Sequence, residues 1–233
     1  MATASVQPEG TAGNNYANGE RIGFGLLLIG APILMLGAAI FHPPHGIESG
    51  EMYYMASHDH TAAFYIAHTC FFLAATLFVP GVVGLARLVH PTHPEAAFWG
   101  CVLSLMGFVG YGALDGIDYM TWVAGKPDTG LDPTAMQDLI DVTLHTNAIL
   151  IPIMLVFTLL PIGLIVLAVG LARAQVMPIW LAALMPIGMV GIAASLQYPV
   201  ALILSGLALL ASFGFVGVKL LRAPNAAVSV GPV

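Results

Sequence analysis

Long apolar stretches separated by short polar segments form the main pattern along this chain. A helix needs about 20 mostly apolar residues to cross the hydrocarbon core of a bilayer, and the stretches have that length. The pattern therefore predicts an all-α, polytopic integral membrane protein with six transmembrane helices in one bundle. We place the six spans at Ile22–Phe41, Thr61–Ala86, Ala96–Trp122, Asp138–Ala172, Val176–Leu196 and Val200–Lys219.

The fourth stretch changes from polar to apolar along its length. Asp132-Pro133 is typical of a helix start, since Asp accepts hydrogen bonds from the first turn and Pro suits the first helical position. Asp138, Asp141 and His145 are spaced i, i+3 and i+7, which places them on one face of a helix. The 25 residues Ala148–Ala172 carry no charge. We expect one continuous helix whose membrane part begins near Asn147.

Composition supports a membrane protein. Of the 233 residues, 58% are hydrophobic and 8% are charged, and the mean hydropathy is +0.90. Soluble domains have about 25% charged residues, so the lipid bilayer is the expected partner of this surface. The sequence contains no Lys/Arg-rich patch, so we expect no nucleic-acid partner. We expect a disordered cytoplasmic tail at residues 1–20, a transmembrane domain at 21–222 and a second disordered tail at 223–233.

The basic residues indicate an orientation. If both termini lie on one side, that side holds five of the six Lys and Arg residues, and Lys126 alone lies on the other. Basic residues favour the cytoplasmic side, so we expect cytoplasmic N and C termini and a multi-pass protein of the plasma membrane. Most acidic residues and histidines fall toward the opposite, extracytoplasmic side.

Several of these histidines and aspartates are expected at similar depths. Counting 1.5 Å per helical residue from the cytoplasmic ends, His68 lies at about 28 Å and Asp115 at about 30 Å. Asp118 follows at about 35 Å, and His60 and His145 at about 40 Å. The hydrocarbon core is about 30 Å thick, so these groups form two layers near its outer boundary.

Ionisable groups at such a depth usually face the bundle interior and indicate function. Imidazole and carboxylate groups suit a divalent metal ion such as Zn, Fe or Cu. We therefore predict a metal site formed by His60, His68, Asp118 and His145. Asp115 and Asp141 would orient these ligands or act as general bases. If the site is catalytic, metal-activated water or oxygen would act on a lipophilic or small substrate.

Two other functions fit the same residues. His68 and His145 are possible axial ligands of a haem in an electron-transfer module. The polar cluster also suits a non-catalytic membrane subunit or transporter, in which it relays protons. Other positions rank lower: His42 and His45 flank a Pro-Pro pair that suggests a helix stop, and Met52-Tyr53-Tyr54-Met55 is typical of a loop at the lipid headgroups.

Short parts of this pattern resemble two families. The gathering of His and Asp at one end of a helical bundle resembles the zinc hydrolases of the ceramidase and adiponectin-receptor type, which carry paired histidines on a final helix. Asp141-Val-Thr-Leu-His145 is similar to the Asp-x-x-x-His copper ligands in the membrane subunit of particulate methane monooxygenase, which has a further histidine downstream. This chain has no histidine after His145, so the resemblance is limited to these motifs.

Overall fold

A computed structural model of the chain describes residues 10–44 and 49–223, and all regular structure within these ranges is helical. The elements are α1 (Gly10–Phe41), α2 (Gly50–Asp59), α3 (Thr61–Val89), α4 (Pro94–Gly125), a 3-10 turn η1 (Pro127–Thr129), α5 (Pro133–His145), α6 (Asn147–Arg173), α7 (Ile179–Ala194) and α8 (Pro199–Arg222). Within the described ranges, five helices are long and apolar enough to cross a membrane, and α7 is a shorter apolar helix. The chain is therefore an α-helical membrane protein.

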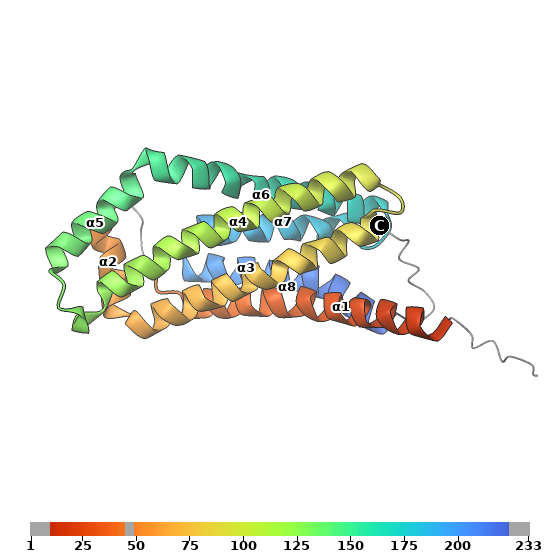
Figure 1. Cartoon of the computed structure of the whole chain (residues 1–233), viewed down its shortest axis with the longest axis horizontal. Coiled ribbons are helices and arrows are strands. Elements are labelled where there is room, and N and C mark those ends of the chain that lie inside the picture. The colour runs from red at the N-terminus through yellow and green to blue at the C-terminus, as the bar shows by residue number, and fades with distance from the viewer. Residues whose placement is uncertain (1–9, 45–48, 224–233) are drawn as a thin grey trace, which may run out of the picture.

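The five long helices and α7 form a closed ring. In order of contact, α1 packs on α3, α3 on α4, α4 on α6, α6 on α7, α7 on α8, and α8 on α1 (Figure 1). Buried apolar side chains from all six helices meet in one core, in which Phe78 stacks on Phe108 and contacts Phe213 at its edge. This core fixes the relative positions of the helices that surround the polar groups described below.

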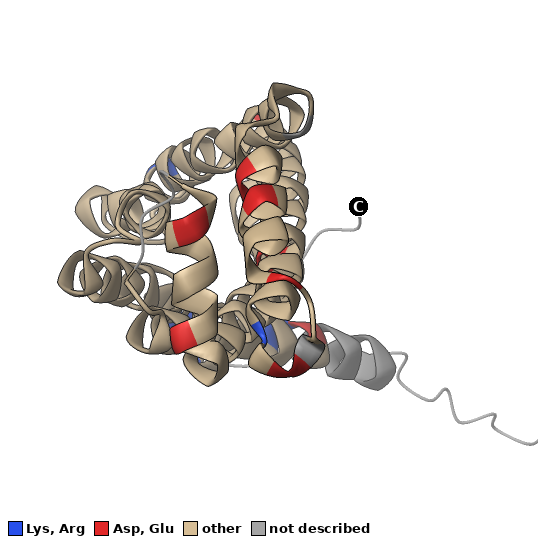
Figure 2. Cartoon of the chain, turned by 90° about the vertical axis from the view of Figure 1, so that its left-hand side faces the viewer, with Lys and Arg blue, Asp and Glu red and all other residues tan. Residues whose placement is uncertain are grey.

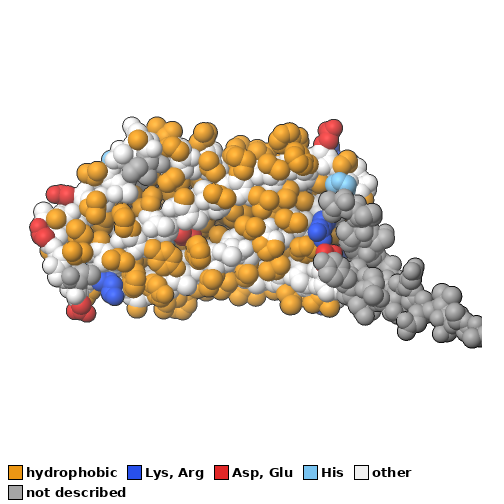
Figure 3. Space-filling view, viewed as in Figure 1, with side chains coloured by type: hydrophobic (Ala, Val, Ile, Leu, Met, Phe, Trp, Pro, Cys, Tyr) orange, Lys and Arg blue, Asp and Glu red, His pale blue; other side chains and the backbone are white. Residues whose placement is uncertain are grey.

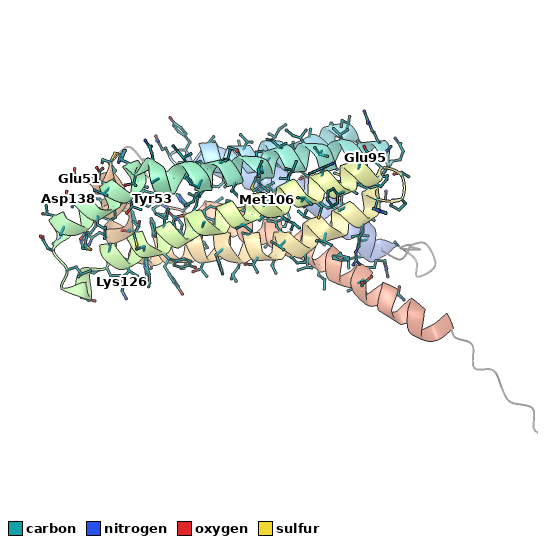
Figure 4. All side chains as sticks on the ribbon, turned by 45° about the horizontal axis from the view of Figure 1, so that its top comes forward. Glu51, Tyr53, Glu95, Met106, Lys126 and Asp138 are labelled. Carbon is teal, nitrogen blue, oxygen red and sulfur yellow. The ribbon has the colours of Figure 1, made fainter. Side chains whose placement is uncertain are left out.

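The two shorter polar helices, α2 and α5, pack against each other at one end of the ring, and we call this pair the cap. A small separate core joins the cap to α3 and α4, with Tyr54, Phe64, Ala124 and Ile140 among its buried members. Figure 2, which views the molecule from the cap end, shows acidic residues on several of the helices that face the viewer. Glu51, Lys126 and Asp138 lie at this end and Glu95 at the other (Figure 4).

The opposite end, which we call the basic end, is held together by arginines and a lysine. Nη1 of Arg21 donates hydrogen bonds to the carbonyls of Leu220 and Ala223, both at 2.5 Å, and so satisfies the last turn of α8. Arg87 pairs with Glu20 at 3.0 Å, and Lys219 donates to a carbonyl before α7. These basic residues, which the sequence analysis placed on the cytoplasmic side of the membrane, thus lie together at one end of the bundle.

Two expectations about local structure were wrong. The predicted long fourth helix is two helices, α5 and α6, separated at Thr146, which adopts an extended backbone with φ −83° and ψ 99°. Residues 52–55, predicted as a loop, are part of helix α2. Helix α1 begins at Gly10, and the predicted disordered tail at residues 1–20 stays a prediction. Residues 1–9 and 224–233 of the predicted tails and His45 lie outside the described residues, and the division into domains stays a prediction.

Candidate functional site

A cavity of about 310 Å³ lies between the cap and the ring. The polar part of its wall comes from the end of α1 and from α2, α3 and α4, which contribute His42, Tyr53, His68, Asp115 and Asp118. The remaining wall is mostly apolar and comes from α4, α5, α6 and the last turn of α7. The site is therefore an apolar pocket with polar groups on one side.

Three side chains on the polar wall contact one another in sequence. The Tyr53 hydroxyl donates to Oδ1 of Asp118, and Oδ2 of Asp118 lies 3.4 Å from Nε2 of His68. Nδ1 of His68 lies 2.8 Å from the Phe64 carbonyl. A carbonyl only accepts, so Nδ1 carries the hydrogen. The Tyr53 hydroxyl and the His68 ring thus face the two oxygens of Asp118 from two other helices.

Neighbouring contacts explain why His68 and Asp118 face each other. On the adjacent positions of the same two helices, the Tyr119 hydroxyl donates to Oγ1 of Thr69 at 2.9 Å. One turn closer to the cap, Nε1 of Trp122 donates to the Thr61 carbonyl at 3.1 Å. These two bonds fix the register of α3 against α4. The His68 ring also stacks on Phe64, with ring centroids 4.1 Å apart, which limits its rotation.

Asp115 lies one turn deeper than Asp118 and is 3% exposed. Its Oδ2 is buried and has no hydrogen-bond partner among the described residues. Aromatic rings from three helices, Tyr111, Phe71 and Phe157, line the same pocket. A buried polar atom without a partner is rare and costly in proteins. Asp115 is therefore the group of this pocket that most needs a partner.

Two tryptophans on α4 allow the depth of the site to be estimated. Trp99 near the basic end is 56% exposed, and Trp122 lies near the cap, 23 residues further along α4. That spacing corresponds to about 35 Å, which matches a hydrocarbon core of about 30 Å with tryptophans at both interfaces. Asp115 and Asp118 then lie about 24 and 28 Å from the level of Trp99. Both carboxylates belong to the apolar span, near its margin at the cap.

The structure brings together only part of the residue set predicted from sequence. His68, Asp115 and Asp118 line the pocket. His60 is exposed at the junction of α2 and α3. The His145 side chain is 54% exposed, and its Nδ1 lies 3.5 Å from the Asp141 carboxylate in the cap.

The predicted four-ligand metal site is therefore not found in this arrangement. Within residues 10–44 and 49–223, no group of three or more His, Cys, Asp or Glu side chains is placed to hold a metal ion. His68 and Asp118 together would supply two ligands, whereas catalytic zinc sites use three from the protein. The residues present do not fit the predicted metal centre.

Two important residues were missed or ranked low from sequence. Tyr53 was assigned to a loop, but it is 5% exposed and bonded to Asp118. His42 ranked below the other histidines, but its ring is 5.3 Å from that of His68 and it lines the pocket. Ser49 followed by Glu51 is a helix-start signal that could have identified α2, since Ser49 accepts a hydrogen bond from Met52.

Comparisons with known proteins identify no relative: no family model matches this chain, and neither a curated protein nor a solved structure matches it at a significant level.

Proposed function

We propose that this protein binds a small lipophilic molecule in the pocket beneath the cap. The observation that carries the proposal is a cavity of about 310 Å³ with a mostly apolar lining and polar groups on one wall. Ligand pockets in proteins have volumes of about 300–1,000 Å³, with apolar linings and a few polar groups that fix orientation. The polar groups on that wall, Asp115 among them, would receive the polar end of the ligand.

The surroundings of the pocket support entry from the membrane. Met154 on α6 and Ala193 on α7 line the pocket and are both exposed. Figure 3 shows that the side of the molecule is covered mainly by hydrophobic side chains, with a small acidic patch among them. Lipophilic molecules concentrate in a bilayer, so a pocket wall that reaches the lipid-facing surface gives them direct access.

The same proposal includes a topology. Helix α7 has 16 residues, or about 24 Å, and we infer that it crosses a thinner part of the membrane as a sixth span. Arg21 donates to the end of α8, and the last turns of α3, α6 and α8 carry Arg87, Arg173, Lys219 and Arg222. This gathering of basic residues supports cytoplasmic termini. The pocket then lies toward the extracytoplasmic side, and a plasma membrane location would follow from this orientation.

Metal-dependent catalysis and haem binding are not part of this proposal. Both predictions relied on His145, which lies on the cap beside Asp141, whereas His68 lies in the pocket beside Asp118. The arrangement is closest to the third function suggested by the sequence, a non-catalytic membrane subunit or transporter with a polar cluster that relays protons.

Photolabelling tests the proposal. The full chain in nanodiscs would be irradiated with a diazirine analogue of octanol, and modified residues would be mapped by mass spectrometry. We expect labelling on the pocket wall of α4, between Leu114 and Asp118, and protection by excess octanol. Leu114→Trp should fill the pocket and reduce this labelling, whereas Val109→Trp, at a 72% exposed position of the same helix, should not. Labelling that is spread evenly over lipid-facing positions and insensitive to octanol would exclude a binding pocket.

A further inference from the structure

We infer that the ligand of this pocket is an organic cation, a molecule with an ammonium group on a lipophilic body. The inference rests on the proposed function and adds the chemical class of the ligand. It is carried by the two carboxylates and the aromatic rings of the pocket lining.

The charged groups of the pocket favour a cation. The lining holds two carboxylates, Asp115 and Asp118, and contains neither Lys nor Arg among its described residues. Both oxygens of Asp118 already have protein partners, Tyr53 at Oδ1 and His68 at Oδ2. An anionic ligand would therefore meet carboxylates without a matching fixed positive charge.

Asp115 is the carboxylate that remains available. It is 3% exposed, it lines the pocket, and its Oδ2 lacks a hydrogen-bond partner among the described residues. Burying a carboxylate away from water is costly unless an opposite charge compensates for it. A ligand ammonium next to Asp115 would supply that charge. A neutral hydroxyl would supply one hydrogen bond but no compensating charge.

Aromatic rings next to Asp115 supply the second attraction. Tyr111 lies between Phe71 and Phe157, with ring centroids 6.2 Å and 5.9 Å away, and all three line the pocket. Tyr53 contributes a further ring on the cap side. Ammonium groups are attracted to aromatic faces, and groups of such rings bind quaternary ammonium ligands. A carboxylate and several aromatic rings thus surround one apolar cavity, and together they suit a lipophilic cation.

Matched eight-carbon compounds test the ligand class. Octyltrimethylammonium, octanol and octanoate would compete with the diazirine analogue of octanol for the wild-type chain in nanodiscs of a neutral glycolipid. We expect octyltrimethylammonium to protect the pocket at an at least about tenfold lower concentration than octanol, and octanoate to protect least. In Asp115→Asn the advantage of the cation should fall to within about twofold. Asp138→Asn, which removes an exposed carboxylate at the same end, should keep it.

The outcomes separate this inference from the proposal on which it rests. Equal protection by the cation and by octanol in the wild type, or a full cation preference in Asp115→Asn, would overturn the ligand class while the pocket remains. Absence of specific pocket labelling would overturn both. Nanodiscs that contain phosphatidylcholine identify the source: reduced labelling indicates that a lipid headgroup supplies the ammonium, and unchanged labelling indicates a free organic cation.

Discussion

Oδ1 of Asp141 accepts a hydrogen bond from the backbone N–H of Gly50 over 2.9 Å, and this bond joins α5 to the first turn of α2. The first N–H groups of a helix lack partners within it, and the positive end of the helix dipole favours a carboxylate there. From sequence, Asp141 was expected to orient metal ligands or to act as a base. In the structure it joins the two helices of the cap, and its role toward a metal stays a prediction.

Asp141→Ala should destabilise the cap. Loss of a helix-capping hydrogen bond costs about 0.5–2 kcal/mol, and we expect a decrease of that size in the free energy of unfolding. Denaturant unfolding of the purified chain in bicelles measures it. Asp138→Ala is the matched control, because Asp138 is an exposed residue one turn away on α5. Equal losses in the two variants would argue against the proposed role of Asp141.

Gly50→Ala should destabilise the same contact through a steric effect. A Cβ at Gly50 would lie 2.4 Å from the Gln137 carbonyl oxygen and 2.5 Å from the Asp141 backbone nitrogen, so the two helices would have to separate. Overpacking of this kind costs about 1–3 kcal/mol. Gly116→Ala provides the comparison, since nothing lies within 4 Å of its Cβ position. The same unfolding assay should show a loss for Gly50→Ala that Gly116→Ala does not share.

Much of the fold could be predicted from the sequence because a membrane helix is defined by local composition. The predicted span at Thr61–Ala86 corresponds to α3 at Thr61–Val89, and the span at Val200–Lys219 corresponds to α8 at Pro199–Arg222. The site was predicted in part for the same reason. Counting along straight helices gave similar depths for His68 and Asp115, and both line the pocket.

The rest of the site depended on non-local geometry. The count placed His145 near the pocket by treating α5 and α6 as one helix, but the chain changes direction at Thr146. Thr146-Asn147 was a local signal of a new helix start at this point, since Thr and Asn both favour the N-cap position of a helix. Residue spacing also gives no information on contacts between α2 and α4, so the bond from Tyr53 to Asp118 could be found only in the folded chain.

Gly107→Ala should disturb the pocket from within the membrane span. A Cβ at Gly107 would lie 2.4 Å from the backbone nitrogen of Leu160, so α4 and α6 would have to move apart. Both helices contribute walls to the pocket. We expect weaker protection of pocket labelling by octanol, together with a loss of about 1–3 kcal/mol in stability. Gly112→Ala, at a position with nothing within 4 Å, should change neither quantity by as much.

Tyr53 and Asp118 should be energetically coupled. Tyr53→Phe leaves Oδ1 of Asp118 without its phenolic donor, and loss of one partner of a buried hydrogen bond costs about 1–3 kcal/mol. In the Asp118→Asn background the same change should cost less. A double-mutant cycle on the free energy of unfolding should therefore give a coupling of about 0.5–3 kcal/mol. Additive effects of the two substitutions would show that this contact contributes nothing specific.

The advantage of Tyr53 over Phe should also depend on pH. Burial, followed by the nearby Asp118 carboxylate, raises the pKa of Tyr53 well above its ordinary value, which is about 10. The fold therefore favours the protonated hydroxyl. Its contribution is complete below about pH 10, where the unfolded tyrosine is also protonated, and it is lost as the pH rises toward the folded pKa.

We accordingly expect the stability difference between the wild type and Tyr53→Phe to be constant from pH 8 to 9 and to narrow above pH 10. While the folded tyrosine stays protonated, the difference in the free energy of unfolding between the two proteins falls by up to about 1.4 kcal/mol for each pH unit. Unfolding measured for both proteins at each pH gives the difference, in which the titration of groups that the two proteins share cancels. A difference that stays constant through pH 11 would mean that the Tyr53 hydroxyl reaches water in the folded protein, and the closed contact between the cap and Asp118 would then be wrong.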